Sequence, residues 1–160
     1  MSNKKAIVTG GSKGIGAGIV RKLAGLGYDV VFSYSSHSAD AFALRDEMRE
    51  KCNVRCECFQ AMLHLPGNGK VFFDQAVAYL GGLDLMVNNA GVATTMFEAL
   101  YNAKYNIIGV VTNPDRPKGR GMKMIASPVK EFSIEKGLEV YQPEKLRKNN
   151  EFIEKIKELK

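Results

Sequence analysis

Short apolar runs and segments of helical period alternate along the whole chain. Residues 6–9 (AIVT) are an apolar run that ends at Gly10, which is typical of a short buried strand. Apolar residues then recur at helical spacing from Ile15 to Leu26, and Gly27 is a stop signal for that helix. By the same criteria, further strands are predicted over 29–34, 54–60, 83–87, 106–112 and 139–142. Further helices are predicted over 38–52, 68–80, 95–102, 128–136 and, on an apolar stripe, 152–159.

The alternation of six strands with six helices predicts the α/β class. Right-handed strand–helix–strand crossovers would build a mostly parallel sheet with helices on both faces. A polar loop rich in proline and glycine is predicted over 113–126, and Ser127 with Pro128 is a start signal for the helix that follows. No segment has the character of a domain linker, so a single domain over residues 1–160 is predicted.

Composition places the chain among ordinary globular proteins. Hydrophobic residues make up 45% of the chain and charged residues 25%, which excludes the disordered, collagen-like and coiled-coil classes. No apolar run approaches the roughly 18 residues of a membrane span, and the first residues lack the pattern of a signal peptide. The three cysteines at 52, 56 and 58 cannot all pair and lack metal-ligand spacing. Reduced thiols, no metal, no membrane partner and a cytoplasmic location are therefore expected.

A glycine-rich segment over residues 9–16 (TGGSKGIG) joins the first predicted strand to the first predicted helix. Gly10 can form the tight turn, Gly14 can let the backbone approach a pyrophosphate, and Gly16 can let the helix pack closely. The N–H groups at the start of a helix attract an anion. Because a strand precedes the segment and a helix follows it, a dinucleotide site is favoured over a turn of purely structural role.

The end of the second predicted strand indicates which dinucleotide would bind. A carboxylate there would hold the ribose 2′-hydroxyl of NAD. The chain has Ser35 and Ser36 instead, and the glycine-rich segment contains the cation Lys13. That combination is expected to accept a 2′-phosphate, which favours NADP over NAD.

Two motifs together resemble those of the short-chain dehydrogenase/reductases. Residues 9–16 match the TGxxxGxG fingerprint of that family, and residues 88–91 (NNAG) match its motif after the fourth strand. The resemblance covers residues 1 to about 93. It implies that Asn88, Ala90 and Gly91 line the adenine–ribose side of a dinucleotide. The family carries an Asp after the third strand that touches the adenine, whereas this chain has Met62 in that region.

The catalytic residues of this family have no counterpart at the expected places. The resemblance would require a Ser after the fifth strand and a Tyr-x-x-x-Lys motif on the next helix. The fifth predicted strand leads instead into residues 113–117 (NPDRP). The single Tyr-x-x-x-Lys, from Tyr141 to Lys145, contains Pro143 and follows a predicted strand, which argues against one helix face carrying both side chains.

The second part of the chain resembles a different family, the N-terminal domain of methionyl-tRNA formyltransferases. The similar segments are 97–100 (FEAL), 110–121 (VVTNPDRPKGRG), 127–130 (SPVK) and 141–146 (YQPEKL). In that family a basic loop contacts the tRNA acceptor end, and the resemblance maps this loop onto Arg116, Lys118, Arg120 and Lys123. The catalytic Asn, His and Asp of the formyltransferases have no counterpart here, since no His follows His64.

The two resemblances meet at equivalent points of two similar folds. Strand four of the dehydrogenases and strand one of the formyltransferases both begin a half of a doubly wound sheet. Joining them implies a Rossmann-like parallel sheet of six strands in the order 3-2-1-4-5-6. Because a random fusion would seldom join equivalent elements, we expect an engineered chimera of a dehydrogenase-like half, 1–93, and a formyltransferase-like half, 94–160.

Three functional hypotheses follow. The favoured one is a Rossmann-fold protein without catalytic activity that binds NADP(H). The second is weak binding of tRNA or other RNA phosphates through the basic loop from Arg116 to Lys123. The third is an NADP-dependent reductase with unusual catalytic residues, such as Tyr101 or Tyr141. The predicted cofactor-binding residues are Gly10, Ser12, Lys13, Gly14, Ile15, Gly16, Ser35, Ser36, Asn88, Ala90 and Gly91.

Overall fold

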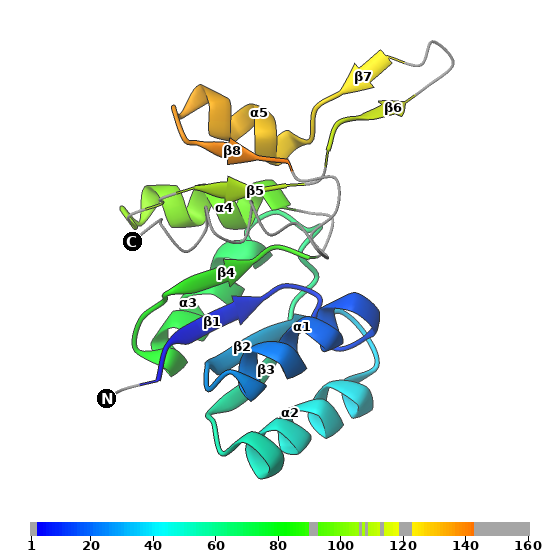
Figure 1. Ribbon diagram of the computed structural model, residues 1–160, viewed down its shortest axis with the longest axis vertical. Coiled ribbons are helices and arrows are strands. Elements are labelled where there is room, and N and C mark those ends of the chain that lie inside the picture. The colour runs from blue at the N-terminus through cyan, green and yellow to red at the C-terminus, as the bar shows by residue number, and fades with distance from the viewer. Residues whose placement is uncertain are drawn as a thin grey trace. The chain divides into compact units, whose positions relative to one another are not determined.

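The chain divides into two compact units, residues 1–99 and residues 100–160, in a computed structural model (Figure 1). The structure describes residues 3–89, 93–105, 107, 109–112, 114–118 and 123–142. The single domain predicted over 1–160 stays a prediction. Within the described ranges, no helix combines the length and the apolar character that crossing a membrane requires.

The first unit is built on a parallel sheet of four strands. The strands are β1 (Lys5–Val8), β2 (Asp29–Tyr34), β3 (Cys56–Gln60) and β4 (Leu85–Val87), and they lie in the order β3-β2-β1-β4. The register pairs Val8 of β1 with Phe32 of β2 on one side and with Val87 of β4 on the other. This order matches the first four positions of the six-strand order that the sequence predicted.

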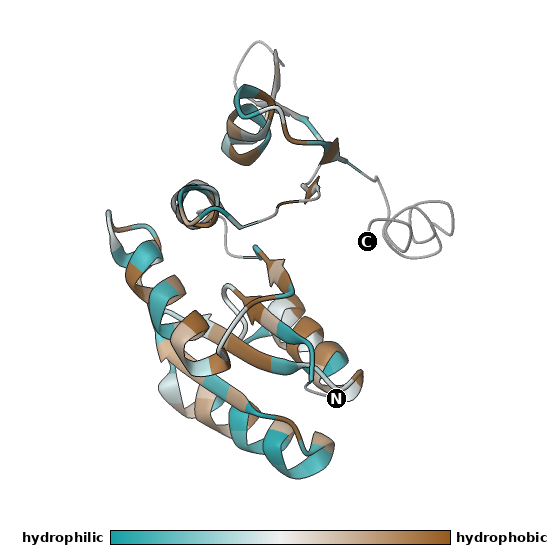
Figure 2. Ribbon diagram, turned by 90° about the vertical axis from the view of Figure 1, so that its left-hand side faces the viewer, coloured by the Kyte–Doolittle hydropathy of each residue, from teal (hydrophilic) through white to brown (hydrophobic). Residues whose placement is uncertain are grey.

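Three helices pack on this sheet. The helices α1 (Gly14–Gly25) and α2 (Ser38–Cys52) cover one face, and α3 (Asn68–Leu80) covers the other (Figure 1). All six residues of β2 are buried, as expected for a parallel strand with helices on both faces. In Figure 2 the strands of this sheet are mostly coloured as hydrophobic, whereas the helices carry both hydrophobic and hydrophilic residues. On one face the core contains Val8, Val20, Val30, Phe32 and Leu44.

The second unit contains short strands and one described helix. The strands β5 (Val110–Val111) and β8 (Val140–Tyr141) pair in parallel, and α5 (Pro128–Glu135) precedes β8. The helix α4 (Ala93–Asn102) crosses the boundary between the two units. Ser127 caps α5 as predicted, because the Lys130 backbone N–H donates to Ser127 Oγ at 3.2 Å. The helix predicted over 152–159 lies outside the described residues.

Two predictions about this part of the chain are wrong. The described strands do not form one sheet of six, because β5 and β8 pair in a separate sheet of two. Apolar periodicity predicts that a segment is buried, but it does not identify the strand with which that segment pairs. The region 113–126 is not a loop throughout, since β6 (Arg116–Lys118) and β7 (Lys123–Ile125) form an antiparallel hairpin. Pro117 argued against a strand at β6, because proline has no N–H to donate, but an edge strand of a hairpin tolerates it.

Candidate dinucleotide-binding site

The glycine-rich segment turns sharply between the carboxyl end of β1 and the start of α1. Gly10 and Gly14 both adopt left-handed backbone conformations, with φ of +62° and +53°. A side chain at either position would be strained, so glycine is required there for the chain to follow this path. The segment lies beside the carboxyl end of β4, because the Thr9 N–H donates to the Val87 carbonyl at 3.0 Å.

Two further glycines allow the segment to pack closely against its neighbours. A Cβ on Gly16 would lie 2.1 Å from the Gly10 carbonyl oxygen and 2.7 Å from Asn89 Nδ2. A Cβ on Gly11 would lie 2.5 Å from Cβ of Phe32. The first turn of α1 and the segment before it therefore touch backbone to backbone, which holds the start of α1 over the end of the sheet.

Polar side chains from β2 and from the segment after β4 fix the loop. Asn89 Nδ2 donates to the Thr9 and Gly10 carbonyls at 3.2 and 3.1 Å. The Gly10 N–H donates to Ser33 Oγ at 2.9 Å, and the Gly11 N–H donates to the Ser33 carbonyl at 2.9 Å. Thr9 Oγ1 donates to Asn88 Oδ1 at 2.9 Å. These contacts hold the backbone of the loop in one conformation.

Sequence reasoning named Asn88 for the site but missed Asn89 and Ser33. Ser33 is 1% exposed in a strand that is otherwise apolar at its centre. A buried hydroxyl requires a hydrogen-bond partner, so a lone Ser in such a strand was a usable signal. Ala90 and Gly91, which the resemblance placed beside the adenine, lie outside the described residues.

The start of α1 presents N–H groups toward solvent. Lys13 stands at the N-cap in an extended conformation, and within the described part of the chain no side chain caps this helix. The first turn contains no acidic residue. Lys13, Gly14 and Ile15 are exposed, and Ile15 retains 79% of its accessible surface. An anion can therefore reach the positive end of the helix.

A shallow hollow of about 520 Å³ lies between α1 and α2. Ser12, Lys13 and Gly14 line it from one side and Asp40 lines it from the other. Lys13 Nζ lies 2.9 Å from Asp40 Oδ2. The hydrogen bond and the charge of Lys13 lower the pKa of the Asp40 carboxyl below its ordinary value. Sequence reasoning missed Asp40, because it sought a carboxylate only at the end of the second strand.

Two serines and a histidine, Ser35, Ser36 and His37, connect the end of β2 to the start of α2. Ser35 and Ser36 are exposed, as a role in binding a ligand requires. Ser36 Oγ lies 2.8 Å from Nδ1 of His37, and the Ser35 carbonyl accepts a hydrogen bond from Gln60 Nε2 at 3.0 Å. His37 adopts a left-handed conformation, with φ of +60°, directly before α2. Sequence reasoning did not single out His37.

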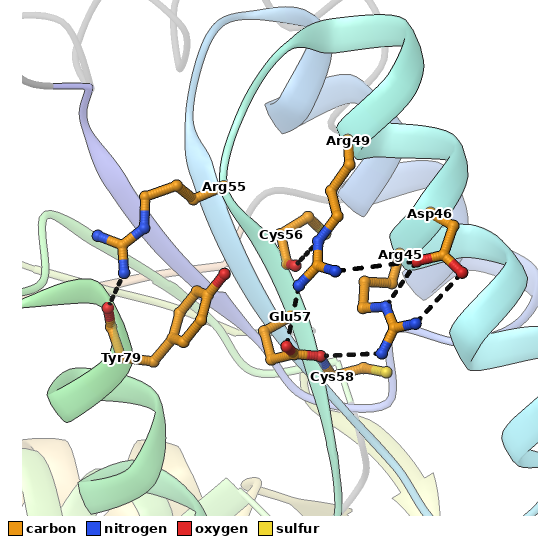
Figure 3. Close-up of polar contacts among 8 residues, drawn as sticks. All are labelled: Arg45, Asp46, Arg49, Arg55, Cys56, Glu57, Cys58 and Tyr79. Carbon is orange, nitrogen blue, oxygen red and sulfur yellow. Dashed lines mark hydrogen bonds and ion pairs between the residues drawn. The ribbon is translucent and has the colours of Figure 1, made fainter.

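A second group of charged residues lies away from this site, on α2 and β3 (Figure 3). Glu57 accepts a hydrogen bond from Arg49 at 2.9 Å and a longer one from Arg45 at 3.4 Å. Arg49 Nε also donates to the Cys56 carbonyl at 2.7 Å. Because β3 is an edge strand, these contacts cover backbone groups that would otherwise be open to pairing.

The cysteines of β3 are buried thiols. Burial raises the pKa of Cys56 to about 12 and that of Cys58 to about 11, so neither is ionised near neutral pH. In the described ranges, no group of three or more His, Cys, Asp or Glu side chains is arranged to hold a metal ion.

The two tyrosines considered for catalysis pack inside the second unit. The Tyr101 ring meets the Phe132 ring edge to face, with centroids 5.9 Å apart. Tyr141 is 8% exposed on β8, and burial together with the negative charge of Glu139 raises the pKa of its hydroxyl. Lys145, its partner in the Tyr-x-x-x-Lys motif, lies outside the described residues.

Three residues of the predicted RNA-binding loop, Arg116, Lys118 and Lys123, lie in β6 and β7. The hairpin register places Lys118 opposite Lys123 and Arg116 opposite Ile125. Arg120 lies outside the described residues.

Comparisons with known proteins match the two parts of the chain to two families. The short chain dehydrogenase family model matches residues 4–111. The C-terminal portion is 58% identical over 65 residues to the methionyl-tRNA formyltransferase of Dictyoglomus thermophilum, a match that covers 41% of this chain and 20% of that protein. The chain thus spans about a fifth of the length of this curated relative.

Solved structures of proteins in complex with NADPH or NAD share the fold. A blue fluorescent protein from a metagenomic library, in complex with NADPH, is 31% identical with a TM-score of 0.63, covering 76% of this chain and 59% of that one. The 3-oxoacyl-[acyl-carrier protein] reductase of Brucella melitensis, in complex with NAD, is 31% identical with a TM-score of 0.51. That match covers 57% of this chain and 34% of the reductase. The two resemblances identified in the sequence are therefore confirmed, although the family match continues past residue 93.

Proposed function

We propose that this chain, which belongs to the short chain dehydrogenase family through residues 4–111, binds NADP(H) at its glycine-rich segment without catalysing hydride transfer. The single observation that carries the proposal is the fixed path of that segment. Gly10 and Gly14 adopt left-handed backbone conformations. Hydrogen bonds from Asn89 and to Ser33 hold the backbone between β1 and α1. A phosphate-binding loop that is already in one conformation need not be ordered when the ligand arrives.

The residues at this site fit a pyrophosphate. A Cβ on Gly14 would meet no atom within 4 Å, so there is open space for a ligand against the backbone. The uncapped start of α1 would supply N–H donors and partial positive charge to the phosphates. The exposed side chain of Ile15 offers an apolar surface that a bound dinucleotide would cover. A bound nicotinamide would supply the hydride chemistry of the family.

The preference for NADP rests on the groups around the 2′ position. Ser35 and Ser36 would donate hydrogen bonds to a 2′-phosphate, and Lys13 would supply a positive charge. The NADPH complex of the blue fluorescent protein supports a dinucleotide of this kind, whereas the NAD complex of the Brucella reductase supports the alternative. The preference is therefore tested by comparing the two cofactors on this chain.

The absence of catalysis is proposed from the sequence and from the position of Tyr141. A general acid must lie within hydrogen-bond reach of the reacting group. Tyr141 is the only tyrosine in a Tyr-x-x-x-Lys motif, and it is buried on a two-residue strand. Tyr101 packs against Phe132. A reductase that uses either tyrosine is the competing hypothesis.

Calorimetric titration with NADPH and NADH tests the proposal. Gly14→Asp should abolish binding, because it places a carboxylate where the phosphates would lie. Gly18→Asp is the matched control, since it adds the same charge to α1 at a position where a Cβ meets nothing within 4 Å. Melting curves establish that both variants are folded. Equal heats for wild type and Gly14→Asp would contradict the proposal, and NADPH-dependent reduction of a carbonyl compound would contradict the absence of catalysis.

The β6–β7 hairpin supports a second candidate function, weak binding to RNA phosphates. The hairpin brings Lys118 and Lys123 to opposing positions, and the similarity to formyltransferases lies in this part of the chain. Binding that depends on a few phosphate contacts is steeply salt-dependent. Fluorescence anisotropy with labelled tRNA should detect binding at about 0.05 M salt and little at about 0.2 M salt. Unchanged binding in the Lys118→Glu/Lys123→Glu variant would contradict this candidate.

The joining of two families in one chain supports an engineered origin. The dehydrogenase-like part supplies β1 to β4, and the formyltransferase-like part lies in the C-terminal portion. A fusion at equivalent elements of two related folds is what a designer would choose. A genomic gene that encodes both parts in this arrangement would contradict an engineered origin.

A further inference from the structure

An ion pair lines the hollow beside the proposed phosphate site. Lys13 Nζ lies 2.9 Å from Asp40 Oδ2, and about half of each side chain is exposed. Lys13 is the residue before α1, and Asp40 lies in the first turn of α2. The structure therefore places a carboxylate against the cation that is expected to meet a 2′-phosphate.

The charges that line this hollow are balanced. Arg21 Nη2 pairs with Glu47 Oε2 at 2.8 Å, and Lys51 Nζ lies 3.1 Å from the other oxygen of Glu47. Lys13 and Arg21 are the cations that line the hollow, and Asp40 and Glu47 are the anions. Lys13 and Arg21 are therefore each paired with a carboxylate before any phosphate binds.

The Asp40 carboxylate is charged under the conditions in which a dinucleotide would bind. Lys13 lowers its pKa through a hydrogen bond and through its charge, and His37 adds a smaller effect in the same direction. The carboxylate is therefore ionised at neutral pH. The Asp40 carboxylate competes with any anionic ligand for Lys13, and it still repels that ligand once the ligand has displaced it from Lys13.

We propose that Asp40 is a specificity-determining residue of this site, which lowers the affinity for a 2′-phosphate by occupying Lys13. The inference rests on the proposed NADP(H) function and extends it. An ion pair with both partners half exposed is weak, so a phosphate of charge about −1.5 to −2 can displace the carboxylate. A ligand without a 2′-phosphate does not need Lys13, and Asp40 has little effect on its binding.

Two nucleotides that differ only in the 2′-phosphate provide the test. Calorimetry would compare adenosine 2′,5′-bisphosphate with adenosine 5′-monophosphate on the full chain, with NADPH as a third ligand. Asp40→Asn should raise the affinity for the bisphosphate about three- to tenfold at low salt, and less at about 0.2 M salt. The affinity for the monophosphate should change by less than about twofold.

Asp46→Asn is the matched control, because it makes the same substitution on α2 in a carboxylate that pairs with Arg45 away from the hollow (Figure 3). It should leave both affinities unchanged. In a Lys13→Met background the effect of Asp40→Asn should disappear, since there is no longer a cation to release. A gain that persists in that background would overturn the proposed role of Lys13.

The outcomes separate this inference from the proposed function. If the wild type binds neither NADPH nor the bisphosphate, the NADP(H) function fails and the inference fails with it. If the wild type binds NADPH but Asp40→Asn and Asp46→Asn bind the bisphosphate equally, the function stands and only the role of Asp40 is overturned. Melting curves of each variant show whether a lost affinity reflects unfolding.

Discussion

Gly16 and Gly18 lie in the same helix but in different surroundings. A Cβ on Gly16 would lie 2.1 Å from the Gly10 carbonyl oxygen, whereas a Cβ on Gly18 would meet nothing within 4 Å. Contact with backbone cannot be relieved by turning a side chain. The identity of residue 16 is therefore fixed by its neighbours, and that of residue 18 is not.

Substituting these two glycines by alanine should change stability in opposite directions. Gly16→Ala should lower the free energy of unfolding by about 1–3 kcal/mol, because the loop or α1 must move to admit the methyl group. Gly18→Ala should raise it by about 0.5–1 kcal/mol, as alanine favours a helix interior. Urea-induced unfolding followed by circular dichroism measures both. Equal stability of the two variants would argue against close packing at Gly16.

Two thiols should be unreactive in the folded chain. Burial raises the pKa of Cys56 to about 12 and that of Cys58 to about 11. Both therefore remain protonated thiols at about pH 8, where an unperturbed cysteine is partly ionised. A thiol-specific disulfide reagent should label them only after urea unfolds the protein, and mass spectrometry identifies the sites. Rapid labelling of Cys56 in the native protein would show that this prediction is wrong.

Among the helices whose starts the structure describes, α5 has the most completely specified one. Ser127 accepts a hydrogen bond from the Lys130 N–H, and Pro128 occupies the first turn, where its missing N–H is not needed. Helix α1 has no such cap among the described residues, and it begins where a ligand would supply the missing partners. The capped start of α5 matches a structural role, and the start of α1, which has no side-chain cap, matches a binding role.

Removing the cap of α5 should destabilise that helix. Ser127→Ala loses the hydrogen bond to the Lys130 N–H, which should lower the free energy of unfolding by about 1 kcal/mol. Ser127→Thr keeps an acceptor oxygen and serves as the control, with a smaller loss. Thermal melts at several urea concentrations compare the variants. The interpretation of Ser127 as a cap would be rejected if both substitutions had the same effect.

At the scale of the whole molecule, the two units differ in the length of their strand ladders. The four strands of the first unit pair over ladders of three to five residues, and β2 is buried along its whole length. Within the described residues, the β5–β8 ladder of the second unit contains two pairs. Short ladders with few buried neighbours open locally at a lower free energy.

Hydrogen exchange should therefore distinguish the units. Amides of β1 and β2 should exchange slowest, and those of β5 and β8 should exchange earlier. Mass spectrometry of peptic fragments measures this, with exchange in urea as the fully exposed reference. Uniform protection across β2 and β8 would indicate that the two units unfold together.

The sequence predicted elements best where its local signals were dense. The predicted bounds of β2, α2 and α3 coincide with those in the structure, because apolar periods run through them and glycines or strongly polar residues flank them. The prediction was poorest over 106–126. There the apolar run NIIGVVT indicates burial but cannot identify a partner strand, and Pro117 concealed a hairpin.

The sequence by itself determined the alternation of elements, the glycine-rich turn and the resemblance to two families, because each depends on residues close together in the chain. Only the tertiary structure decided what holds the turn. Asn89 and Ser33 are distant in sequence from Gly10, and the sheet brings all three together. It also placed Asp40 against Lys13, since contacts between two helices depend on how the helices pack and not on the spacing of residues within either one.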